Sequence, residues 1–139
     1  MRILEVKTER RKIGDRGEKL AAKFLKKKGY KILKKNYADS SYEIDIIAED
    51  KEHTVFVEVK TRTVGRESAK EPRPASSVTP EKQRKIISAA KYYLAFRKSD
   101  KKVRFDIVEV YMSGENEKKA ERILHLESAF NRNTASMHR

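Results

Sequence analysis

The sequence predicts a single α/β domain in which helices and short strands alternate over residues 1–130. Two patterns carry this prediction. Apolar residues recur at helical spacing in segments 13–25 and 86–94, whereas segments 42–48 and 55–61 alternate apolar and polar residues, as strands do. The 139 residues fit the usual size of one domain, and no internal repeat or linker indicates a second one.

The first half of the chain predicts one helix and three strands. The first helix opens at the motif 14–18 and is ended by Gly29, because glycine readily adopts the left-handed conformation found after helix C-termini. Segment 30–33 is a short predicted strand. A short polar segment separates the strands at 42–48 and 55–61, which predicts a β-hairpin.

The second half predicts one helix and two strands. Thr79 and Pro80 are typical of an N-cap and a first helical residue, and the helix is expected to extend to about Arg97. A strand is predicted at 103–111, where the pattern largely alternates, and a weaker one at 123–126.

Two segments lack an apolar pattern. Segment 63–78 is polar, contains a glycine and two prolines, and is predicted to be a long loop that adds basic residues beside the central strands. Segment 131–139 is predicted to be a disordered tail.

The composition of the chain favours some classes of partner and excludes others. The chain has 34 Lys and Arg against 21 Asp and Glu, a net charge of +13, so nucleic acid is the natural partner. The lack of cysteine excludes disulfides and thiolate metal sites. No apolar run approaches the ~20 residues of a membrane span, and the first residues are too charged for a signal peptide. We therefore expect a soluble, cytoplasmic protein with no membrane partner.

Charged side chains interrupt the two central strands. Asp45 and Glu43 are expected to point to one face of the first strand. Three apolar residues are expected to share its other face: Ile44, Ile46 and Ala48. Pairing that is symmetric about the hairpin loop places Asp45 opposite Glu58, and the same register places Glu43 opposite Lys60.

Two carboxylates at such close range repel each other unless a cation lies between them. The pair Asp45 and Glu58 therefore predicts a divalent-cation site. The alternative is an exposed sheet face that carries cross-strand Glu–Lys pairs. A carboxylate on one strand, followed by carboxylate-x-Lys on the next, favours the metal site because it suits cleavage of a phosphodiester.

The order of these motifs resembles a known group of proteins. It is similar to the PD-(D/E)XK nuclease superfamily, and the whole chain resembles the bacterial YraN-type family, which is related to archaeal Holliday-junction resolvases. Tyr42 departs from the pattern, because the family usually has glycine there. The matching segments are 14–18, 43–45, 56–62, 82–83, 104–106 and 129–130.

The resemblance implies a restriction-endonuclease-like core, α-β-β-β-α-β, with a mixed central sheet flanked by helices. It implies that Asp45 and Glu58, together with the Val59 carbonyl, hold Mg²⁺, for which Mn²⁺ can substitute. Lys60 would orient the attacking water or neutralise charge on the phosphate. Glu18 is the fourth implied catalytic residue, and its alternative role is a favourable charge near a helix N-terminus.

Several other polar residues have two interpretations. Glu43 either adds a metal ligand or pairs with Lys60. Asp106 is left out of the catalytic set, because a partly buried salt bridge explains it equally well. A solvated helix end could account for Lys82 and Gln83. Four residues are candidates for nucleic-acid contacts: Arg62, Lys82, Gln83 and Arg84.

The predicted function is a metal-dependent endonuclease that hydrolyses phosphodiester bonds in DNA, with selectivity for branched or junction DNA. The alternative is a non-catalytic nucleic-acid-binding protein with a nuclease-like fold. Related resolvases act as dimers on two-fold symmetric junctions, so the resemblance also allows a homodimer.

Overall fold

The predicted order of helices and strands is found, with the weak last strand present as a full strand. The computed structural model describes residues 8–39, 42–64, 78–113 and 119–133. Most of the predicted loop and most of the predicted tail therefore lie outside the described residues. The elements are α1 Glu9–Lys27, β1 Lys31–Ala38, β2 Glu43–Glu49, β3 His53–Val64, α2 Pro80–Ala95, β4 Lys102–Ser113 and β5 Ala120–Phe130.

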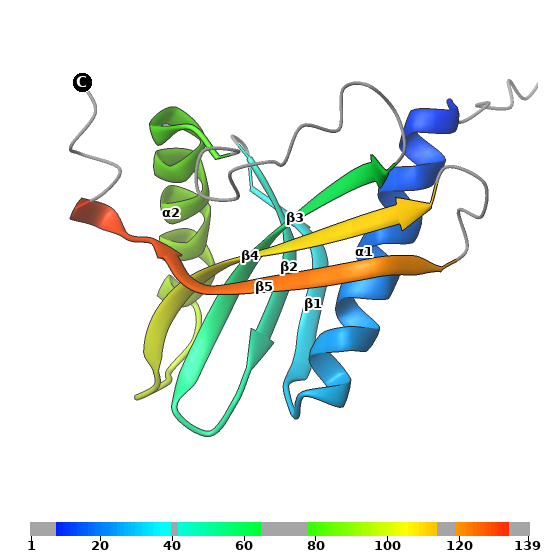
Figure 1. Ribbon diagram of the computed structural model, residues 1–139. Helices are drawn as coiled ribbons and strands as arrows, with labels where there is room; N and C mark the ends of the chain where they lie inside the picture. The colour runs from blue at the N-terminus through cyan, green and yellow to red at the C-terminus, as the bar shows by residue number, and fades with distance from the viewer. Residues whose placement is uncertain (1–7, 40–41, 65–77, 114–118, 134–139) are drawn as a thin grey trace, which may run out of the picture.

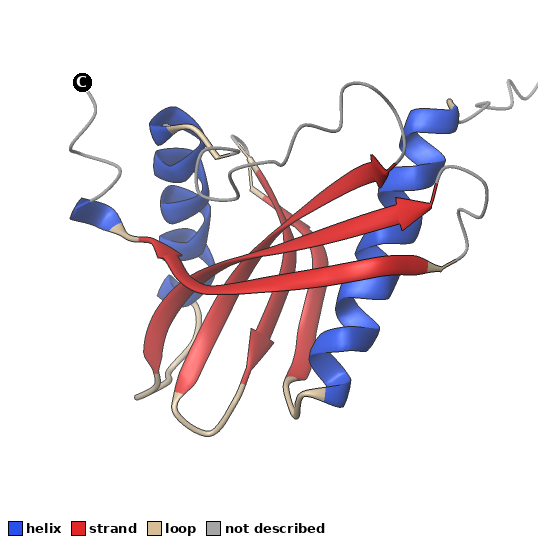
Figure 2. Ribbon diagram, viewed as in Figure 1, coloured by secondary structure: helices blue, strands red, loops and turns tan. Residues whose placement is uncertain are grey.

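The strands form one mixed sheet between the two helices. Its order is β1-β2-β3-β4-β5, with β3 and β4 parallel and the other neighbours antiparallel. In Figures 1 and 2, α1 and α2 lie on opposite sides of the sheet, and both begin at the same end of it. The predicted α/β fold is confirmed, and the arrangement is consistent with a restriction-endonuclease-like core.

Both faces of the sheet are buried. Leu25 of α1 packs with Ile46 and Val57 on one face, and Ile86 of α2 packs with Phe56 on the other. Burial of such apolar surface is the main favourable contribution to folding. Neither helix in the described ranges is long and apolar enough to cross a membrane.

α1 begins earlier than predicted but ends where expected. Thr8 is its N-cap, since its side chain accepts a hydrogen bond of 3.2 Å from the amide of Arg11. The helix therefore starts before the motif 14–18 that was predicted to open it. Gly29 has a φ of +102°, which confirms the predicted glycine after the helix C-terminus.

β5 is longer than its sequence pattern predicts. The pattern indicated only 123–126, but the strand runs from Ala120 to Phe130. Its register with β4 shifts between the Phe105 and Ile107 pairings, and Ser128 has a φ of +52°. Such an irregularity disrupts the alternation of faces, so the strand is hard to see in the sequence.

α1 and β3 approach closely at Gly17. A Cβ atom placed there would clash with the side chain of Thr61. We expect Gly17→Ala to displace α1 and lower the free energy of unfolding by roughly 1–3 kcal/mol, as overpacking does. Urea denaturation should show this loss, and Thr61→Ala in the same chain should recover part of it. A fully additive double variant would contradict the clash.

Candidate active site

The candidate site lies where β2 and β3 separate. Their pairing ends at Ile46 and Val57. Beyond this point the start of β2 turns toward α2, whereas β3 continues toward α1 (Figure 1). Asp45 and Glu58 are the next residues on the two strands, so they lie at the base of this fork. The register predicted for the hairpin is confirmed up to this point.

The alternation of β2 is broken at the fork. Ile46 and Ala48 belong to the core beneath α1, but Ile44 belongs to the core beneath α2. The prediction that these three residues share a face is therefore wrong. Asn36, which lies opposite Asp45 on β1, has a φ of +52°, and this irregular backbone marks the place where the faces reverse.

Three carboxyl groups meet at the fork. Those of Asp45 and Glu58 are in hydrogen-bonding contact, and Glu18 of α1 contacts Asp45 as well. Asp45 is fixed by the amide of Val59, which donates to its Oδ2 at 2.7 Å. Glu18 is the tenth residue of α1, so the alternative role at the helix N-terminus does not apply, because that effect is confined to the first turn.

Burial and mutual repulsion raise the pKa of these acids. Burial is the larger cause for Glu58 and raises its pKa to about 8, with Asp45 contributing next. Burial also raises the pKa of Asp45 to about 6, although the Val59 amide opposes the change. The pKa of Glu18 is raised too, again chiefly by burial. The site therefore disfavours its own negative charge and would be stabilised by a cation.

Lys60 lies on the α2 side of the fork. Its pKa is lowered, first by burial and then by Lys82 from the first turn of α2, while Glu58 opposes the change. Glu43 instead lies near Asn36, and the β2–β3 pairing does not extend to it. The predicted pairing of Glu43 with Lys60 is therefore not formed.

The site includes two residues outside the predicted set of site residues. The hydroxyl of Tyr42 donates to Oε2 of Glu58 at 3.1 Å. The amide of Asn36, oriented with its nitrogen toward the acids, donates to Glu18 at 3.1 Å and to Glu43 at 3.0 Å. Tyr42 had a signal, since it replaces a small residue beside the motif. Asn36 had none, because only the folded sheet brings it to Glu18.

A cleft of about 730 Å³ opens beside Glu18, between α1 and the first two strands. Its lining carries three basic and three acidic side chains: Arg11, Lys19, Lys35, Asp15, Glu18 and Glu43. Of the three acids that meet at the fork, Glu18 lines this cleft, so the site can be approached from the α1 side.

The candidates for nucleic-acid contact differ in their surroundings. Lys82 lies at the site beside Lys60. Arg62 is half-buried on β3, two residues after Lys60, so alternation places both on one face. Arg84 is exposed on α2. Gln83 is buried, and its amide donates to the Val78 carbonyl at 2.9 Å, which favours a structural role.

The donor set suits a hard cation that keeps much of its water. Within the described ranges, no group of three or more His, Cys, Asp or Glu side chains is arranged to hold a metal ion. Mg²⁺ does not require such a group, because it is commonly bound by one or two carboxylates, several waters and substrate phosphates. Asp45 and Glu58 therefore fit Mg²⁺ better than they fit zinc.

Comparison with known proteins identifies the family. The model of the family described as "Uncharacterised protein family UPF0102" matches residues 17–110. The chain belongs to the UPF0102 family. A UPF0102 protein of Caldanaerobacter subterraneus is 43% identical over 125 residues, which cover 89% of this chain and 98% of the relative. One from Clostridium perfringens is 50% identical over 106 residues, which cover 76% and 84%.

The UPF0102 match includes the whole candidate site. Residues 17–110 contain Glu18 from α1, both carboxylates of the fork, and Lys60 and Lys82. The sequence predicted a YraN-type family. UPF0102 is YraN-like, so this prediction is confirmed at the level of the family.

Asp106 of this UPF0102 chain is a structural residue. Arg104 binds it through two nitrogens at 2.9 and 2.8 Å, and Nε2 of His125 lies 2.7 Å from it. The amide of Ser128 donates to the same carboxylate at 3.0 Å. The buried salt bridge that was one interpretation of Asp106 is therefore present, and it fixes β5 to β4 at their irregular register.

Proposed function

We propose that this protein is a metal-dependent endonuclease of the PD-(D/E)XK type, which hydrolyses phosphodiester bonds in DNA and selects branched or junction DNA. The observation that carries the proposal is the pair of half-buried Asp45 and buried Glu58, held in contact at the fork with Lys60 beside it. Such a pair lowers the stability of the fold unless a cation neutralises it. Binding a divalent cation is the purpose that best fits its chemistry.

Each residue of the fork has a role in this proposal. Asp45 and Glu58, with the Val59 carbonyl, would hold Mg²⁺ or Mn²⁺. The bound ion would supply an activated water and stabilise charge on the phosphate. Lys60 would position that water or neutralise the phosphate, and its lowered pKa, caused first by burial, suits a group that exchanges a proton. Glu18 would hold Asp45 in place from α1.

The basic surface supports a nucleic-acid substrate. The net charge of +13 favours a polyanion. Lys82, Arg62 and Arg84 lie on the elements that flank the fork and would contact phosphates. Contacts of this kind bind without reading the sequence and weaken steeply with salt, so selectivity would come from the shape of the DNA.

One observation favours a second candidate function, a non-catalytic nucleic-acid-binding protein. The Tyr42 hydroxyl donates a hydrogen bond to Oε2 of Glu58, an oxygen that a metal ion would need as a ligand. The ring also fills space where the resembled family usually has glycine. If Tyr42 does not move aside, the fork keeps the basic residues that would bind nucleic acid but cannot bind a metal ion or cleave.

The test is cleavage of a labelled panel of four-way junction, flap, single-stranded and linear duplex DNA, with Mg²⁺, Mn²⁺ or chelator. We expect metal-dependent cutting that favours a branched member of the panel. Asp45→Asn, which keeps the acceptor for the Val59 amide, should slow cutting at least about a hundredfold. The matched control is Asp100→Asn, an exposed aspartate outside the fork.

Binding measured on the same panel separates the two functions. Lys60→Ala should bind DNA nearly as well as the wild type and yet fail to cut it. Salt-sensitive binding by the wild type, with no cutting in either metal, would overturn the endonuclease and leave the binding protein. Loss of binding and folding together in Lys60→Ala would make that residue structural.

A further inference from the structure

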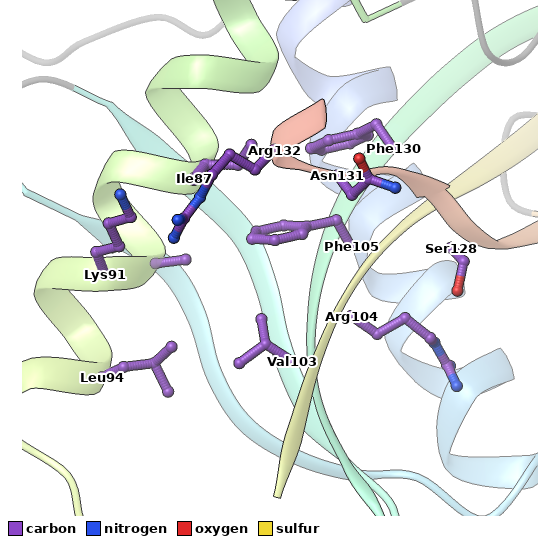
Figure 3. Close-up of a pocket in the computed structure, with 11 residues that line it drawn as sticks. Ile87, Lys91, Leu94, Val103, Arg104, Phe105, Ser128, Phe130, Asn131 and Arg132 are labelled. Carbon is purple, nitrogen blue, oxygen red and sulfur yellow. The ribbon is translucent and has the colours of Figure 1, made fainter. Parts of the chain in front are cut away.

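A second cavity, of about 390 Å³, lies away from the carboxylates. It is bounded by the later turns of α2, the start of β4 and the chain around the end of β5 (Figure 3). Lys91, which lines it, is nine residues after Lys82, or about 14 Å along the helix axis. No step of the proposed cleavage uses this cavity.

The cavity has a rigid aromatic wall. The ring of Phe105 points into it from β4 (Figure 3). This ring is stacked on Phe56 on one side, at a centroid distance of 5.5 Å, and on Phe130 on the other, at 5.3 Å. Leu94 and Val103 extend the apolar surface toward the other end of the cavity. Because both faces of this ring are covered, it presents its edge to the cavity. An apolar group could therefore enter against this edge, a surface that is already in place.

The charge at the cavity is positive. The side chain of Arg132 extends across the cavity toward α2, where Lys91 lies (Figure 3). Arg104 also lines the cavity, but its guanidinium turns away to Asp106. Among the lining residues that the structure describes none is Asp or Glu, whereas Ser128 and Asn131 add polar groups. The complementary ligand has an apolar body, polar edges and an anionic group.

We propose that this cavity binds a nucleotide, with the base against Phe105 and the phosphate on Lys91 and Arg132. Its volume lies within the range of sites for small molecules. A base combines a flat apolar face, which can pack on the edge of an aromatic ring, with polar edges of its own, and a phosphate is an anion that arginine and lysine bind well. The nucleotide could be free or be an unpaired residue of a strand. Neither case depends on cleavage at the fork.

The test uses 2-aminopurine deoxynucleoside monophosphate, whose fluorescence is quenched when its base leaves water for an apolar pocket. The protein has no tryptophan, so the probe can be excited almost alone. We expect saturable quenching that Lys91→Glu and Arg132→Glu each weaken about tenfold or more, because each reverses a charge at the phosphate. Lys23→Glu, an exposed lysine of α1, is the matched control and should change affinity little.

A second probe identifies the source of the nucleotide. It is a short single-stranded oligonucleotide with 2-aminopurine at its centre, titrated in chelator so that no cleavage occurs. Quenching of the oligonucleotide alone, lost in Lys91→Glu, would assign the site to an unpaired residue of a strand. Quenching of the monophosphate would support a free nucleotide. If Lys91→Glu and Lys23→Glu weaken both probes equally, or neither probe is quenched, the proposal is overturned.

This result is independent of the proposed function. If quenching is seen in chelator and is lost in Lys91→Glu, it supports nucleotide binding in this cavity, whether or not the protein cuts DNA in Mg²⁺. Conversely, cutting that requires Asp45 would stand even if neither probe bound here.

Discussion

Glu58→Gln is expected to abolish metal-dependent cleavage and, in chelator, to raise the melting temperature of the protein. Glu58 is 7% exposed and touches the carboxyl group of Asp45, so burial and the neighbouring acid oppose its ionisation and raise its pKa to about 8. Glutamine has the same shape, keeps an acceptor for Tyr42 and offers an amide donor to Asp45. Removal of the repulsion should stabilise the fold by roughly 1 kcal/mol or more, or about 3 °C.

The metal should reverse the order of stability. On the proposed function, Mg²⁺ should bind the folded wild type and raise its melting temperature, as any ligand of the native state does, whereas the variant should respond weakly. Differential scanning fluorimetry in chelator and in Mg²⁺ measures both effects, and cleavage of the preferred DNA should fall at least about a hundredfold. Glu52→Gln, in the exposed turn before β3, is the control. A destabilised variant in chelator would contradict this account.

The carboxylate pair could be predicted from the sequence because it depends on local structure. A hairpin with a short polar loop has few registers, and the observed pairing of Ile46 with Val57 is the predicted one. The end of α1 was predictable for the same reason, because Gly29, just after the helix, supplies the positive φ that follows its C-terminus. These features depend on residues that are close together in the chain.

The surroundings of the pair could not be predicted, because they arise where regular structure fails. Strict alternation placed Ile44 beside Ile46, but Ile44 packs on the other face of the sheet, next to the irregular backbone of Asn36. The same break brings Asn36 to Glu18 and Glu43, a contact that no spacing in the sequence indicates. Residues that depart from a repeating pattern leave no periodic signal.

The fork explains why each face of the sheet contributes to one site. Where β2 and β3 remain paired, the sheet separates the core beneath α1 from the core beneath α2. Where they separate, Glu18 from α1 and Lys82 from α2 both reach the carboxylates. Acid and base are thus delivered from opposite sides, with Glu18 in contact with Asp45 and Lys82 acting on Glu58.

Asp106→Ala is expected to produce the largest loss of stability. The Asp106 side chain is fully buried and accepts hydrogen bonds from Arg104 and the Ser128 amide, with His125 in contact. Its removal takes the closest carboxylate from the Arg104 side chain, which is only 10% exposed, and leaves Glu127 at 3.9 Å as the remaining acid. Breaking a buried pair in this way costs about 3–5 kcal/mol. Urea denaturation should show the loss, whereas Asp100→Ala, at an exposed position, should change it by less than about 0.5 kcal/mol.

The same carboxylate should make the fold sensitive to acid. Burial alone would raise the pKa of Asp106, but hydrogen bonds from His125, Arg104 and the Ser128 amide outweigh it and lower the pKa below its ordinary value of 3.8. A lowered pKa in the folded state means that the stabilisation is complete above the ordinary value and is lost as the pH falls through the folded value. Asp106→Asn cannot lose a charge. The difference in free energy of unfolding between wild type and Asp106→Asn should therefore be constant near neutral pH and shrink below about pH 4. A difference that stays constant in acid would show that the charge of Asp106 does not hold β5 to β4.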